Sequence, residues 1–171
     1  MTRRPAASCR KVGELPIIDV DPLMASILLV AHAPLASALL EVAQHAYADC
    51  QRDMLAVDVP PTASLAVAAE LVSAALKTLP GPEVLVLTDA FGATPCNAAM
   101  SAVDGVHARV VTGINVPMVW RALCYAHLPL EDLVVRAADG GRQGIMQVAT
   151  PRRQNQPNRP ATDDPDQRSD Q

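Results

Sequence analysis

Aromatic residues are almost missing from this chain, which has one Phe, one Trp and two Tyr among its 171 residues. Half of the residues are nevertheless hydrophobic, so a core has to be built from Ala, Val, Leu and Ile. This mixture is typical of a parallel sheet covered by Ala-rich helices. The length predicts one domain with a sizeable core.

A strongly basic surface is missing as well. The formal net charge is −4, and the Arg residues are scattered or lie near the ends of the chain. We expect no nucleic-acid partner, because binding to a phosphate backbone requires clustered basic residues. The cysteines form no C-x-x-C pair, so the sequence predicts no metal site and free thiols in a reducing cytosol. These cysteines are Cys9, Cys50, Cys96 and Cys124.

Long hydrophobic runs are also absent. The longest mainly apolar run, residues 25–31, is far shorter than the roughly 20 residues that a membrane helix needs. Residues 1–23 hold no apolar segment of signal-peptide length, so we expect a cytoplasmic protein without stable membrane insertion. Residues 1–23 and 150–171 are predicted to be disordered, and translation from Met24 is an alternative for the first segment. The folded domain is expected over residues 24–149.

Short apolar runs alternate with helical patterns along the rest of the chain. Strands are predicted over residues 26–31, 54–59, 83–87 and 107–112, with a short final strand over 145–148. Helices are predicted from residue 34 to about 50, from the N-cap Thr62 to 79, from 94 to 103, from 117 to about 127, and from 131 to a stop at Gly140-Gly141. The pattern predicts an α/β doubly wound, four-stranded parallel sheet with helices on both faces and an antiparallel C-terminal strand. The order 2-1-3-4 is assumed as the usual one for this architecture.

The segment after the third predicted strand carries the candidate chemistry. Asp89 leaves the carboxyl end of that strand, and Thr94 is placed to cap a helix that has Pro95 at its first position. Gly92 allows the backbone to turn sharply between them. Because free amides and the helix dipole attract anions, Gly92, Ala93 and Thr94 are predicted to bind a phosphate group.

His32 follows the first predicted strand. In the order 2-1-3-4 the first and third strands are neighbours, so His32 and Asp89 are expected to meet at the carboxyl edge of the sheet. The carboxylate would hold one ring nitrogen, which fixes the tautomer and makes the other nitrogen the better nucleophile. A phosphoryl group fits the adjoining anion site best. The other histidines, which are His45, His107 and His127, are expected at the surface or at helix caps.

Three motifs in order resemble the mannose-family enzyme IIA of the bacterial sugar phosphotransferase system. They are His32 after the first strand, DAFGATPCNAA over residues 89–99, and GINVPM over residues 113–118. The family's versions of the last two read roughly D-x-x-G-G-S-P-x-N-A-A and G-x-N-x-P-M. The resemblance covers about residues 25–148, and three ordered motifs make it specific.

The resemblance implies a phosphohistidine carrier that needs no cofactor. On this interpretation His32 accepts a phosphoryl group from the phosphocarrier protein HPr and passes it to a IIB partner. Asp89 would orient the histidine, and Thr94 stands where the family has a serine beside the phosphate. Further matching positions, expected to shape loops or contact partners, are Asn97, Asn115 and Pro117. The family is homodimeric and cytoplasmic, in some members with an exchanged C-terminal strand, for which residues 145–148 are the candidate.

The chain departs from the family pattern at two positions. Ala33 and Ala93 stand where the family has glycine, and each would cost about 1 kcal/mol if its backbone needed a positive φ. Two alternative functions remain. One is a stand-alone regulatory IIA whose phosphorylation state gates a partner protein. The other is the phosphocarrier subunit of a dihydroxyacetone kinase, which shares the fold and the histidine after the first strand.

Overall fold

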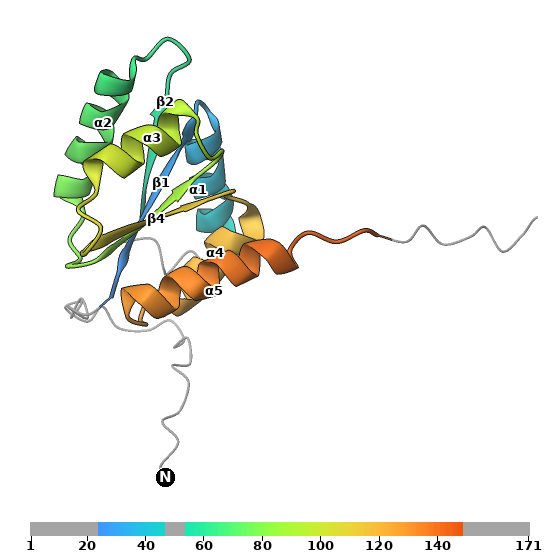
Figure 1. Ribbon diagram of the computed structural model, residues 1–171. Helices are drawn as coiled ribbons and strands as arrows, with labels where there is room; N and C mark the ends of the chain where they lie inside the picture. The colour runs from blue at the N-terminus through green and yellow to red at the C-terminus, as the bar shows by residue number, and fades with distance from the viewer. Residues whose placement is uncertain (1–23, 47–53, 149–171) are drawn as a thin grey trace, which may run out of the picture.

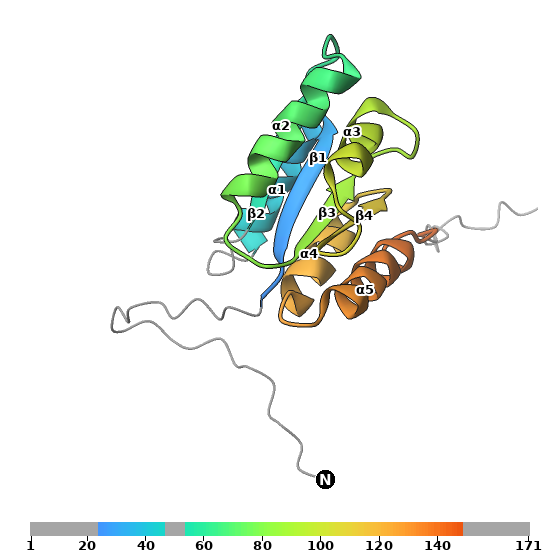
Figure 2. The ribbon, with the colours of Figure 1, turned by 60° about the vertical axis from the view of Figure 1, so that its left-hand side comes forward.

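The computed structural model describes residues 24–46 and 54–148, so the expectations for Cys9, Cys50 and both terminal segments lie outside the described residues. Within these ranges one parallel sheet is formed by β1 (Ser26–His32), β2 (Met54–Val59), β3 (Val84–Thr88) and β4 (Ala108–Thr112). The strand order is β2-β1-β3-β4, which confirms the predicted order (Figures 1 and 2).

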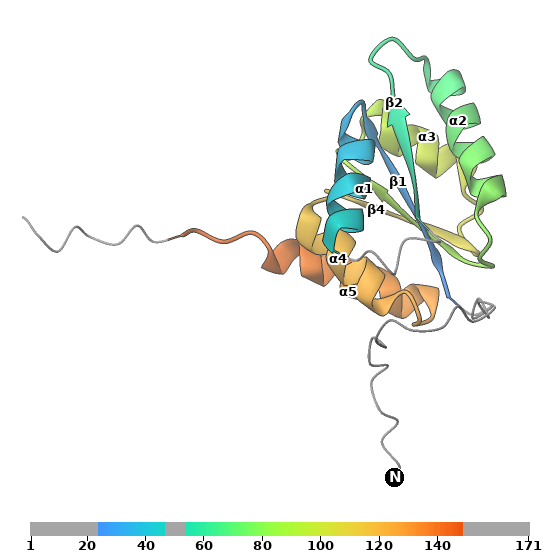
Figure 3. The same ribbon diagram turned by 180° about the vertical axis from the view of Figure 1, so that it is seen from behind.

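Helices cover both faces of this sheet. In the described chain, α1 (Leu35–Ala46), α4 (Val116–Tyr125) and α5 (Leu130–Gln143) lie on one face, and α2 (Leu65–Thr78) and α3 (Thr94–Ala102) on the other (Figures 2 and 3). The division follows the alternation of side chains along the strands. In β1, Ile27 and Leu29 pack toward the first group of helices, whereas Leu28 and Val30 pack toward the second. The fold is therefore the predicted doubly wound α/β architecture.

The strand register brings two chain segments together at the carboxyl edge. Val30 of β1 pairs with Thr88 of β3, and His32 pairs with Val59 at the end of β2. Asp89, the residue after Thr88, therefore emerges from the sheet beside His32. All four strands run in parallel, so the loops that follow them gather at this one edge.

Two helix starts differ from the prediction. The N-cap of α2 is Ser64 rather than Thr62, and its hydroxyl accepts the amide of Val67 at 3.3 Å. The residues before it form a turn instead, in which the Ala63 amide donates to the Pro60 carbonyl at 3.0 Å. The N-cap of α3 is Ala93 rather than Thr94, because the Ala93 carbonyl accepts the Asn97 amide at 2.9 Å.

The C-terminal end of the domain also differs. Gly140 and Gly141 were expected to stop a helix, but α5 continues through both to Gln143. They serve a packing role instead, because a Cβ at Gly140 would lie 2.5 Å from the Cβ of Arg121 in α4. Residues 145–148 form no strand within the described chain, so the C-terminal strand predicted there is wrong for a single chain. The segment leads away from the sheet after α5 and has no strand edge beside it (Figure 1).

Candidate functional site

The side chains of His32 and Asp89 meet at the carboxyl edge of the sheet, as the sequence predicts. Nδ1 of His32 lies 2.6 Å from Oδ2 of Asp89, and the main-chain amide of His32 donates to the same oxygen at 2.9 Å. The other carboxylate oxygen accepts the amide of Ala90 at 2.7 Å. Both oxygens of the carboxylate are therefore held, and the carboxylate holds the ring.

The protonation of this pair follows from its surroundings. Burial acts to raise the pKa of Asp89, but the hydrogen bonds from the amides of His32 and Ala90 and from the His32 ring outweigh it, so this pKa lies below its ordinary value. An ionised carboxylate only accepts hydrogen bonds, so Nδ1 of His32 must carry the hydrogen between them. In the tautomer with its hydrogen on Nδ1, Nε2 keeps its lone pair. The His32 side chain is 51% exposed, whereas that of Asp89 is only 11% exposed.

The loop after Asp89 is held by its own glycine and by two neighbouring segments. Gly92 has a φ of +79°, the left-handed region that glycine adopts at little cost. Nδ2 of Asn97 donates to the Gly92 carbonyl at 2.9 Å, and the amide of Gly113 donates to the Asp89 carbonyl at 3.0 Å. The predicted turn at Gly92 is confirmed, and Asn97 lies where it shapes that turn.

The amino end of α3 lies directly beyond this loop. Its N-cap, Ala93, has a φ of −77°, so the predicted cost of an alanine at this position does not arise. No side chain caps α3, and Pro95 has no N–H to satisfy. Within the described residues, the amides of Thr94 and Cys96 in the first turn therefore have no side-chain acceptor. Together with the Thr94 hydroxyl, they form a site suited to an anion.

Sequence reasoning missed Asp58, which lies in β2 at the same edge. Its Oδ1 accepts the amides of Ala36 at 2.9 Å and Ser37 at 3.1 Å, in the first turn of α1. An N-cap side chain ordinarily makes these bonds, but Pro34, at the N-cap position, has no polar side chain. A carboxylate near the end of a predicted strand was the available signal, but Ala36, whose amide it accepts, lies 22 residues earlier in the sequence.

Asn115 and Pro117 lie in the turn from β4 to α4. Oδ1 of Asn115 accepts the amide of Met118 at 3.0 Å, and its Nδ2 donates to the carbonyl of Gly141 at 3.1 Å. Pro117 lies in the first turn of α4. The observed contacts of Asn115 stabilise the turn and fasten α5 to α4.

His107 has a partner that the sequence analysis did not foresee. Nδ1 of His107 lies 2.8 Å from Oδ2 of Asp104, in the connection between α3 and β4. This connection precedes β4, so the pair lies at the amino edge of the sheet, opposite to His32. The histidine is exposed as expected, but it is not an isolated surface residue.

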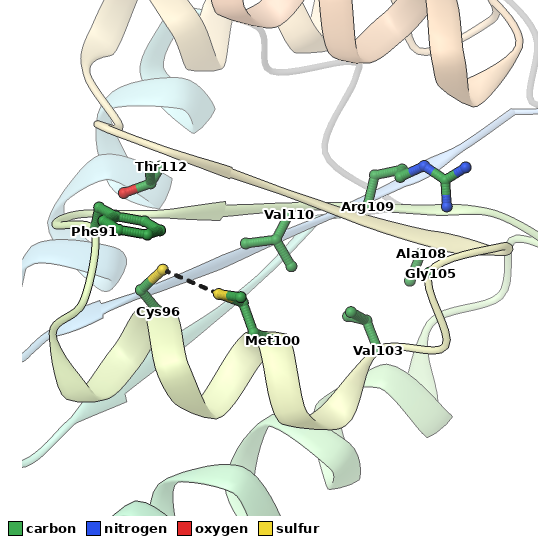
Figure 4. Close-up of a pocket in the computed structure, with 9 residues that line it drawn as sticks. All are labelled: Phe91, Cys96, Met100, Val103, Gly105, Ala108, Arg109, Val110 and Thr112. Atoms are coloured by element: carbon green, nitrogen blue, oxygen red, sulfur yellow. Dashed lines mark hydrogen bonds between the residues drawn. The ribbon is translucent and has the colours of Figure 1, made fainter.

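A groove of about 360 Å³ runs between α3 and β4, the strand at one edge of the sheet (Figure 4). Side chains of α3 and β4 face each other across it, and Phe91 lies at one end beside Thr112. Sγ of Cys96 lies 4.0 Å from Sδ of Met100 in its wall. The lining residues are Phe91, Cys96, Met100, Val103, Gly105, Ala108, Arg109, Val110 and Thr112.

Two further properties concern only residues 24–46 and 54–148. There, no cluster of His, Cys, Asp and Glu side chains is arranged to hold a metal ion. None of the helices in the same ranges is both long and apolar enough to span a membrane.

A family model matches most of the chain. The family model described as "PTS system fructose IIA component" matches residues 26–138, which include His32, Asp89 and all four strands. The chain belongs to this family. Membership in the IIA family, together with the fold, supports a phosphocarrier role in the sugar phosphotransferase system. It also implies interaction with HPr and IIB components.

Solved structures of IIA proteins are similar to this chain. The mannose/sorbose specific IIA subunit of the phosphotransferase system from Enterococcus faecalis is 26% identical, with a TM-score of 0.67 over 75% of this chain and 98% of that one. The phosphotransferase system component EIIA from Streptococcus agalactiae is 24% identical, with a TM-score of 0.62 over 72% and 97%, a likeness that shows the fold alone. A comparison with curated proteins gives no significant match.

Proposed function

We propose that this IIA protein is a phosphohistidine carrier, a phosphotransferase without a cofactor. His32 accepts a phosphoryl group from HPr at Nε2 and passes it to a IIB partner. The observation that carries the proposal is the 2.6 Å contact between Nδ1 of His32 and the Asp89 carboxylate, at the edge where α3 begins uncapped. This contact leaves Nε2 as the nucleophile.

The proposed transfer exchanges one nitrogen–phosphorus bond for another. The lone pair of His32 Nε2 attacks the phosphorus, and the bond to the donor's histidine breaks, so that the donor ring keeps the electron pair. Positive charge develops on the His32 ring, and the Asp89 carboxylate stabilises it through Nδ1–H. Transfer to the IIB partner reverses these steps.

The phosphoryl oxygens would be bound by the segment between Asp89 and α3. Amides of Thr94 and Cys96 and the Thr94 hydroxyl are the donors available there, and such donors stabilise charge that spreads over the phosphoryl group during transfer. Gly92 and Ala93 form the turn of backbone that leads from Asp89 to these amides. Nδ2 of Asn97 donates to the Gly92 carbonyl at 2.9 Å and so stabilises this turn.

The test is phosphorylation by labelled phosphoenolpyruvate in the presence of enzyme I and HPr. We expect one acid-labile phosphate per chain of the wild type and none in His32→Ala. His107→Ala is the matched control, because it removes the other histidine that is bonded to an aspartate, and it should label like the wild type. Label retained by His32→Ala would contradict the proposal.

We also infer a cytoplasmic homodimer, as the resemblance implies. Among the described residues no strand pairs with the outer edge of β4, and the groove beside it is lined mainly by apolar side chains. Ile145, Met146 and Val148 are 78%, 76% and 83% exposed, which favours their pairing with that edge in a second copy. Sedimentation of the full chain tests this, and a monomer at micromolar concentration would contradict it.

A further inference from the structure

Helices α1 and α3 follow β1 and β3, the strands that end at His32 and just before Asp89, and the first turns of these two helices differ. The first turn of α3 has no side-chain cap. The first turn of α1 holds a carboxylate, because Oδ1 of Asp58 accepts the amides of Ala36 at 2.9 Å and Ser37 at 3.1 Å. The cap of α1 is supplied by the neighbouring strand β2 and not by the loop that leads into the helix.

The end of β2 also holds the start of that loop. The carbonyl of Val59 accepts the amide of Ala33 at 3.0 Å, directly after His32, which pairs with Val59 in the sheet. Asp58 and Val59 therefore hold both ends of the short segment between His32 and α1. The hydroxyl of Ser37, in the first turn of α1, donates to the carbonyl of Pro34 in this segment at 3.1 Å. The position of the His32 backbone thus depends on contacts with β2.

The carboxylate also changes the electrostatics of the edge. An open helix start attracts anions, and the start of α1 lies three residues after His32 in the sequence. Asp58 satisfies two of its amides and places a negative charge there. Because Asp58 already accepts these two amides, they are not available to a phosphoryl group on His32, whereas the first turn of α3 has no side-chain cap.

We propose that Asp58 is a positioning residue for phosphoryl transfer. It holds the segment that carries His32 and closes the start of α1 to phosphate, so that the phosphoryl group is directed to α3. This inference rests on the proposed function, because it assigns Asp58 a role in the same reaction. In this role Asp58 contacts neither the phosphoryl group nor the His32 ring.

The test compares Asp58→Ala with Asp58→Asn in the full chain. Asp58→Ala removes the acceptor, and we expect HPr-dependent phosphorylation to slow by at least about tenfold, because small displacements of a reacting group are costly. Asp58→Asn keeps an oxygen for both amides and should recover most of the rate. Ser64→Ala is the matched control, since it removes the cap of α2 and no bond to the segment that follows His32, and it should react like the wild type.

A second measurement reports how the His32 ring is held, and it does not require phosphoryl transfer. Nitrogen-15 NMR of the imidazole should show hydrogen on Nδ1 in the wild type, in Asp58→Asn and in Ser64→Ala. In Asp58→Ala we expect a mixture of tautomers, because the ring is no longer held against Asp89. A loss of stability alone would not change the tautomer.

The outcomes separate the two proposals. If the wild type takes up no phosphate, the proposed function fails, whereas the tautomer measurement still tests the positioning by Asp58. If Asp58→Ala reacts at the wild-type rate with hydrogen kept on Nδ1, or if Ser64→Ala slows equally, the positioning role is overturned. Should Asp58→Ala not fold, Asp58→Glu replaces it, because the longer side chain shifts the carboxylate; an unchanged rate and tautomer in Asp58→Glu would also overturn the role.

Discussion

Two histidines of this protein each lie against an aspartate through Nδ1, and the two pairs are built differently. Asp89 is 57 residues from His32 in the sequence, and its side chain is 11% exposed. Asp104 is three residues from His107, and its side chain is 53% exposed. The first pair joins the last residue of β1 to the residue that follows β3, whereas the second lies within one loop.

The surroundings explain why the same contact serves different ends. Oδ1 of Asp104 accepts the amides of Val106, His107 and Ala108 at 2.9, 2.9 and 3.2 Å, so this carboxylate closes the turn that leads into β4. Asp89 instead follows a buried strand, and its loop leads to the open start of α3. Under the proposed function, the comparison teaches that a histidine–aspartate contact becomes a candidate for phosphoryl transfer where an uncapped helix start adjoins it.

The largest expected difference between the pairs lies in the rate of phosphorylation. Asp89→Ala should slow HPr-dependent labelling by about 10²- to 10⁴-fold, because the His32 ring loses its orientation and the charge that stabilises it. Asp104→Ala should leave the rate within about twofold, since Asp104 holds only its own turn. Rapid-quench measurement of the labelled chain gives both rates. Equal slowing in Asp89→Ala and Asp104→Ala would show that the two pairs do not differ in their importance for phosphorylation.

A fall in pH should weaken both histidine–aspartate pairs and lower the free energy of unfolding in each case. The hydrogen bond from the His107 ring, followed by the amides of its turn, lowers the pKa of Asp104, and hydrogen bonds that outweigh burial lower that of Asp89. A carboxylate with a lowered pKa stabilises the fold above its unfolded pKa of about 4, and this contribution disappears as the pH falls through the folded value. The free energy of unfolding should therefore fall between about pH 5 and pH 2.

Urea unfolding over that pH range tests this expectation. The dependence on pH should be shallower in Asp89→Asn and in Asp104→Asn than in the wild type. Curves that run parallel to the wild type would mean that these carboxylates are not stabilised in the folded state.

The smallest expected effect concerns the glycine beside each pair. Gly92 and Gly105 have φ values of +79° and +73°, and a Cβ at either position would meet no atom within 4 Å. Alanine at either position should therefore lower the free energy of unfolding by about 1 kcal/mol through the backbone alone. Only Gly92→Ala should also slow phosphorylation, because only that glycine leads to α3. If Gly105→Ala slowed phosphorylation and Gly92→Ala did not, the loop at Gly92 would not be the one that serves phosphoryl transfer.

Several features of the site were predictable because their signals are local. The apolar run before Asp89 predicted β3, and the alternation of such runs with helical patterns predicted the architecture. Given the usual strand order, the meeting of His32 with Asp89 followed, and the structure has both the order and the contact. The boundaries of α2 and α3 were less accurate, since several neighbouring residues can start a helix.

The sequence by itself determined the alternating strands and helices, the residue types at the carboxyl edge and the motifs of the IIA family, because each is written in neighbouring residues. Only the tertiary structure decided that Asp58 caps α1, that Gly140 lies inside α5 against Arg121, and that residues 145–148 make no strand in one chain. Each of these depends on which backbone or strand edge comes close in space, a distance that no local pattern of residues encodes.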